Sequence, residues 1–81
     1  MDRSAILSKV NELMRDVFDE DDLVATEEMT ADDVEDWDSA NHMRFMVAIE
    51  EAFHIELSGN EVNAPENIGE VIDLIASKLK S

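Results

Sequence analysis

The stretch that decides the fold is Trp37–Phe53, WDSANHMRFMVAIEEAF. Its pattern predicts one helix with Asp38 as the N-cap, because a carboxylate there can accept hydrogen bonds from the free backbone N–H groups of the first turn. Ser39 then stands at about the first helical position, with its hydroxyl at the positive end of the helix dipole. A phosphate ester at that position would be favoured by the same N–H groups and dipole.

This helix carries apolar residues on two sides rather than one. The side predicted to face the core holds Phe45, Ile49, Ala52 and Phe53. The side that Ser39 shares holds Met43, Met46 and Val47, together with Glu50 and Glu51. Because one buried stripe does not need this second set, we expect it to be exposed and to form a docking strip for another protein.

A resemblance follows from these residues and the ones after them. Trp37-Asp38-Ser39, the Met- and Val-rich helix, Glu50-Glu51-x-Phe53 and the alternating Ile55-Glu56-Leu57 together resemble the acyl carrier protein family. The motif of that family is Asp-Ser-Leu, whose serine carries phosphopantetheine. Asp38 and Ser39 match, whereas Ala40 stands where leucine is usual. The departure leaves the attachment chemistry intact and bears on local packing and on the choice of partner enzymes.

The resemblance implies a carrier and not an enzyme. A phosphopantetheinyl transferase, using coenzyme A and magnesium, would esterify Ser39 with 4′-phosphopantetheine, with Asp38 as the motif residue and helix cap. Acyl-loading, acyl-transferring or condensing enzymes would then dock through basic patches. By resemblance Asp38 and the two glutamates would meet their Lys and Arg side chains. The expected partner-binding residues are Ala40, Met43, Arg44, Met46, Val47, Glu50 and Glu51.

Size and composition narrow the class of protein. The 81 residues make one domain, 1–81, and without any Cys they can form neither a disulfide nor a thiolate metal site. The apolar runs are too short for a membrane span, and no secretory signal follows Met1, so we expect a cytoplasmic protein. Twenty-one acidic residues against six basic ones give a net charge of −15. Such a field repels nucleic acid and anionic membranes, attracts basic partner surfaces, and suits a monomer.

The rest of the chain predicts an all-α fold. Helical spacing marks a first helix over about 4–18, and residues 19–36 read as a long acidic loop. Four apolar residues are expected to attach that loop to the helices: Leu23, Val24, Met29 and Val34. After a turn at 58–60, a short helical turn at 61–64 precedes a last helix opened by Asn67 and Glu70 as a capping box. The expected architecture is a small antiparallel bundle of three main helices plus one short helix, with a long first loop.

No catalytic or specific metal site is predicted. His42 lies one turn from Ser39 but is rotated toward the Phe45–Ile49 face, which favours a half-buried packing role over that of a base. The acidic loop lacks the glycine that an EF-hand requires at its sixth position, although loose divalent binding stays open.

Two other classes of function remain. The chain could be an unmodified acidic helical adaptor that binds partners through Met43, Met46 and Val47, or, further behind, an enzyme. Among carriers, fatty acid, polyketide and other lipid pathways all stay open. Trp37 and Ala40 lean toward a specialised carrier of secondary metabolism or lipid modification. The cargo and its chain length are not readable from the sequence.

Overall fold

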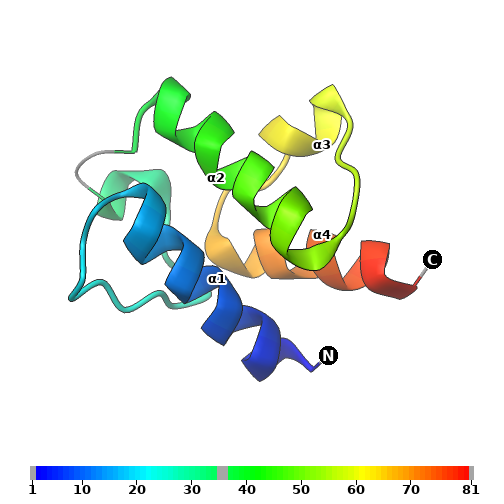
Figure 1. Ribbon diagram of the computed structural model, residues 1–81, viewed down its shortest axis with the longest axis horizontal. Coiled ribbons are helices and arrows are strands. Elements are labelled where there is room, and N and C mark those ends of the chain that lie inside the picture. The colour runs from blue at the N-terminus through cyan, green and yellow to red at the C-terminus, as the bar shows by residue number, and fades with distance from the viewer. Residues whose placement is uncertain (1, 35–36, 81) are drawn as a thin grey trace.

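The computed structural model describes residues 2–34 and 37–80. Within these residues the chain is all-α and has no strand, as predicted. Its elements in order are α1 (Arg3–Val17), the 3-10 helix η1 (Ala31–Asp33), α2 (Ser39–Phe53), α3 (Gly59–Asn63) and α4 (Ile68–Lys80). Figure 1 shows α1 running in the opposite direction to both α2 and α4, with the short α3 linking the latter two. None of the helices within the described residues is long and apolar enough to cross a membrane.

One hydrophobic core joins the three long helices. Each contributes side chains at helical spacing, as amphipathic helices of a small bundle must. From α1 and α4 the buried side chains are Ile6, Val10, Met14, Ile68, Val71, Ile72 and Ile75. From α2 they are Phe45, Met46, Ile49 and Phe53. Phe18, directly after α1, adds an aromatic ring that packs on Phe45 with 6.1 Å between ring centroids.

Side-chain caps fix where the helices begin. α1 starts at Arg3, one residue before the predicted boundary, because Asp2 accepts a hydrogen bond of 2.8 Å from the backbone N–H of Ala5. The turn predicted at 58–60 is instead the start of α3. There Ser58 and Glu61 form a reciprocal capping box, so Gly59 already belongs to the helix.

The long first connection is held against α1 and α4. Leu23, Ala25 and Val34 are buried, whereas Val24 is 67% exposed, so the expectation that Val24 attaches this loop to the helices is wrong. Residues 23–25 lie in no helix or strand, so sequence spacing does not determine which of two neighbouring residues there turns inward. The end of the connection, Glu35 and Asp36, lies outside the described residues.

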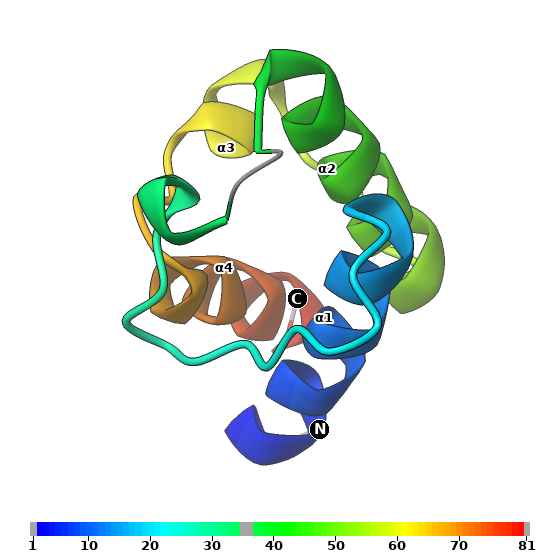
Figure 2. The same ribbon diagram turned by 90° about the vertical axis from the view of Figure 1, so that its left-hand side faces the viewer.

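Backbone hydrogen bonds fasten this connection to the start of α4. The N–H of Ile68 donates to the carbonyl of Met29 at 2.9 Å, and the N–H of Gly69 donates to that of Glu27 at 2.8 Å. Figure 2 shows the connection passing across α1 and α4 before it reaches η1. A Cβ on Gly69 would lie 3.1 Å from the Glu27 carbonyl oxygen, so glycine permits this close approach.

Candidate functional site

The start of α2 is built by one aspartate. Asp38 is extended (φ −106°, ψ −177°), and its carboxylate accepts a hydrogen bond of 2.8 Å from the N–H of Asn41. Its carbonyl accepts the first helical bond, also 2.8 Å, from the N–H of His42. The predicted N-cap is therefore confirmed, and Ser39 is the first helical residue. Ser39 is exposed, and within the described part of the chain its hydroxyl makes no hydrogen bond.

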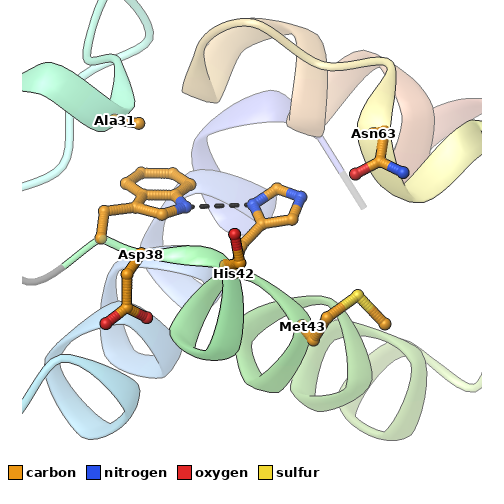
Figure 3. Close-up of a pocket in the computed structure, with 7 residues that line it drawn as sticks. Ala31, Asp38, His42, Met43 and Asn63 are labelled. Atoms are coloured by element: carbon orange, nitrogen blue, oxygen red, sulfur yellow. Dashed lines mark hydrogen bonds between the residues drawn. The ribbon is translucent and has the colours of Figure 1, made fainter.

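A pocket of about 550 Å³ lies against Ser39. Figure 3 shows Met43 and Asp38 on the α2 side of this pocket, and Asn63 and Ala31 reaching it from other parts of the fold. The complete lining is Ala31, Trp37, Asp38, Ser39, His42, Met43 and Asn63. The lining is mixed, with an aromatic ring and a thioether beside amide, carboxylate and hydroxyl groups. A flexible chain attached at Ser39 could therefore find both polar and apolar contacts here.

His42 is hydrogen-bonded on both ring nitrogens. Trp37 Nε1 donates to His42 Nδ1 at 3.0 Å, the dashed line in Figure 3, and His42 Nε2 lies 2.8 Å from the carbonyl oxygen of Val62. The side chain is half-buried, as predicted. Neither ring nitrogen is left to accept a proton from Ser39, so the imidazole is not placed to act as its base.

Trp37 joins this site to the core. Its ring lies 5.1 Å from Phe18 and 5.6 Å from Phe45 between centroids, the latter in a T-shaped pair. The sequence motif contains Trp37 but did not predict that its ring lines the pocket. A buried or half-buried indole usually finds an acceptor for its N–H, which is the signal that could have paired it with His42.

The outer face of α2 differs from the predicted docking strip at two residues. Met46 is fully buried, so the expectation of an exposed Met46 is wrong. Helix α2 buries Met46 beside Phe45, Ile49 and Phe53, so its buried sector is wider than the single core stripe expected from the sequence. Glu50 is only half-buried at the surface, and its carboxylate accepts from the N–H of Leu57 at 3.0 Å. The exposed members of the predicted set are Ala40, Met43, Arg44, Val47 and Glu51.

Away from this face, Glu61 of α3 has a lowered pKa. The first cause is the ammonium of Lys78 in α4, which lies 2.8 Å from its carboxylate, and the second is hydrogen bonding with Ser58. No group of three or more metal-ligating side chains occurs within residues 2–34 and 37–80. The net charge of the chain is −15. Among the exposed residues of the predicted docking set, Arg44 is the single cation.

The fold and the helix-start serine define a class of small helical carrier domains, and one comparison with solved structures agrees. The solution NMR structure of holo acyl carrier protein from Geobacter metallireducens matches with a TM-score of 0.85 and 35% sequence identity. The match covers 91% of this chain and 85% of that one. No family model and no curated protein sequence matches.

At this identity and coverage the chain belongs to the acyl carrier protein family. A role as an acyl carrier that works with partner enzymes follows at that level.

Proposed function

We propose that Ser39 is the attachment site of 4′-phosphopantetheine and that the chain presents acyl thioesters to partner enzymes. The observation that supports this most is the position of Ser39. Its exposed hydroxyl stands at the first residue of α2, directly after Asp38, in a chain that belongs to the acyl carrier protein family. A phosphodiester there would be stabilised by the positive end of the helix dipole.

The residues around Ser39 fit such a group. The pocket of about 550 Å³ gives the arm space beside its attachment point, and Asp38 holds the first turn of α2 in place through its bond to Asn41. When bound, the phosphopantetheine group supplies a thiol that holds an acyl group as a thioester, in a chain that has no cysteine of its own.

The chain does not supply a base for the attachment reaction. Both ring nitrogens of His42 are occupied by Trp37 and Val62, so they are not available to the Ser39 hydroxyl. We therefore assign deprotonation of Ser39 to the phosphopantetheinyl transferase, which brings coenzyme A and magnesium. The role of the carrier is to present the hydroxyl on an ordered helix end.

Docking is assigned to the exposed part of α2. Met43 and Val47, 50% and 45% exposed, offer apolar contact, and Glu51 and Asp38 offer charges to a basic patch on the partner. Exposed ion pairs contribute only about 0–1 kcal/mol each. Complexes with loading, transferring and condensing enzymes should therefore be transient and sensitive to salt, which suits a carrier that visits several enzymes. Trp37 and Ala40 favour a carrier of secondary metabolism or lipid modification, and Arg44 on the exposed face of α2 would narrow the set of partners.

The test is modification by a promiscuous phosphopantetheinyl transferase with coenzyme A and magnesium. Intact-protein mass spectrometry should show the addition of one phosphopantetheine to the wild type and none to Ser39→Ala. Ser8→Ala is the matched control, because Ser8 is also exposed but lies on α1. If the wild type stays unmodified with several transferases, or if Ser39→Ala is still modified, the assignment fails.

The unmodified adaptor is the alternative. Burial of Met46 removes one of the three residues on which its binding strip depended. Mass spectrometry of the protein from its own cells separates the two functions, because a carrier should be found at least partly modified.

A further inference from the structure

Two of the residues that line the pocket beside Ser39, Trp37 and His42, belong to a chain of two hydrogen bonds that runs through His42. One bond reaches Trp37, which precedes α2, and the other reaches Val62 in α3. The imidazole therefore links the start of α2 to α3, which follows later in the chain.

The chemistry of the two partners selects one form of the imidazole. The indole N–H of Trp37 can only donate, so His42 Nδ1 must be an acceptor without a proton. The carbonyl of Val62 can only accept, so His42 Nε2 must carry the proton. Only the neutral tautomer with hydrogen on Nε2 satisfies both. The doubly protonated ring would keep the bond to Val62 and lose the bond to Trp37.

The bond to Val62 also completes a helix end. Helix α3 has only five residues, and the last carbonyls of a helix have no partner within the helix. Val62 is buried, so an unpaired carbonyl there would lose hydration without replacement. His42 satisfies this carbonyl and thereby anchors the C-terminal end of α3 to α2.

Charged side chains on the elements around this pocket bind groups other than the His42 imidazole. The Asp38 carboxylate caps Asn41, and the Asp33 carboxylate of η1 accepts from Thr30. In α3, Glu61 pairs with Lys78 of α4. In the described part of the chain none of these groups is hydrogen-bonded or ion-paired to the imidazole. The hydrogen bonds that the structure gives to the imidazole are those with Trp37 and Val62.

We propose that His42 is a positioning residue whose neutral imidazole clasps Trp37 and α3 around the pocket beside Ser39, and that protonation releases Trp37. A group attached at Ser39 would contact this pocket first. An effect of His42 on how that group is held therefore rests on the proposed function. The clasp itself is tested on the unmodified protein, so its failure is distinct from a failure of phosphopantetheine attachment.

The first test reads the tautomer and the coupling between the two rings. Nitrogen NMR of the wild type at neutral pH should show His42 with hydrogen on Nε2. Trp37 is the only tryptophan, so its indole N–H resonance and its fluorescence report on this site alone. Both signals should follow the protonation of His42 with the same midpoint. A tautomer with hydrogen on Nδ1, or a Trp37 signal that changes with a different midpoint, would overturn the proposal.

The second test uses variants. His42→Gln keeps an N–H and a carbonyl but cannot titrate, and His42→Phe keeps a ring without either hydrogen bond. Both should make the Trp37 signals independent of pH across the range of imidazole ionisation. His54→Gln is the matched control, since His54 is the other histidine of the chain and is exposed, and it should behave as the wild type.

A third test measures amide hydrogen exchange in α3. Loss of a typical hydrogen bond corresponds to about a 2- to 13-fold change in a local opening constant. His42→Phe should speed exchange at the Val62 amide by about this factor, and His42→Gln should restore part of the protection. Unchanged exchange in His42→Phe, with circular dichroism showing a folded protein, would exclude an anchoring role for the imidazole.

Discussion

Replacement of Met46 by alanine tests the packing of α2 most directly, because it concerns the residue whose position the sequence pattern misjudged. Met46 is fully buried among the side chains of the core, whereas Met43, one turn earlier on the same helix, is 50% exposed. The two substitutions remove the same atoms from two different environments. A difference between them therefore measures burial and not the helix propensity of methionine or alanine.

The expected size follows from burial. Truncation of a buried methionine to alanine typically costs about 2–5 kcal/mol, because transfer free energy is lost and a cavity is left. At roughly 0.05–0.15 kcal/mol per residue, an 81-residue domain has a free energy of unfolding of about 4–12 kcal/mol. Met46→Ala should thus remove a large part of the stability. Met43→Ala should change it by about 0.5 kcal/mol or less, as for other surface substitutions.

Urea denaturation followed by circular dichroism at equilibrium measures both changes. In a domain of this size each kcal/mol also lowers the melting temperature by about 4–8 °C, so Met46→Ala should melt at least about 8 °C below the wild type. Equal stability of the two variants would refute the buried position of Met46. It would restore the exposed docking strip that the sequence pattern suggested.

Two further predictions concern charged side chains. Glu51→Lys should raise the KM of a cognate partner enzyme for this protein without loss of stability. Glu50→Lys should raise the KM and also lower the free energy of unfolding, because the Glu50 carboxylate accepts from the backbone N–H of Leu57. An unchanged KM for Glu51→Lys would remove Glu51 from the docking surface. The lowered pKa of Glu61, caused first by Lys78, means that this carboxylate stabilises the fold above its unfolded-state pKa and that the contribution is lost as pH falls through its folded-state pKa. Between about pH 5 and pH 3 the stability of Glu61→Gln should therefore fall less steeply than that of the wild type, and parallel curves in urea titrations would contradict the pairing.

Local chemistry made the start of α2 predictable. An N-cap depends on one side chain and the N–H groups two or three residues later, so Asp38 and Ser39 could be placed from the sequence alone. The same holds for one half of the capping box predicted at Asn67 and Glu70, since the Asn67 side chain accepts from the N–H of Glu70 at 2.9 Å. The other half differs from the prediction, because the Glu70 carboxylate accepts from the N–H of Glu66 at 3.2 Å. Ser58 and Glu61 have the same spacing and form a complete box, but the neighbouring Gly59 suggested a turn and concealed the start of α3.

Features that depend on distant residues could not be read in the same way. A helical projection orders the residues of α2 by angle, but the angle at which burial stops is set by how many neighbours surround the helix. That is why Met46 was placed on the wrong side of the boundary while Met43 and Val47 were not. The bond between His42 and Val62 joins residues far apart in the chain, and no periodicity reports on such a pair.

Ser39 lies between two constraints that act on the same helical turn. On one side Asp38 holds the N–H groups of Asn41 and His42, and on the other the His42 ring holds Trp37 and α3. The hydroxyl itself is bound by neither. A group attached to the Ser39 hydroxyl would move about a fixed attachment point. The pocket wall that His42 holds in place would limit the positions open to that group. A substitution that releases this wall should therefore alter how an attached group is presented, while the buried side chains that α1 and α4 contribute to the core, such as Ile6 and Ile72, keep the protein folded.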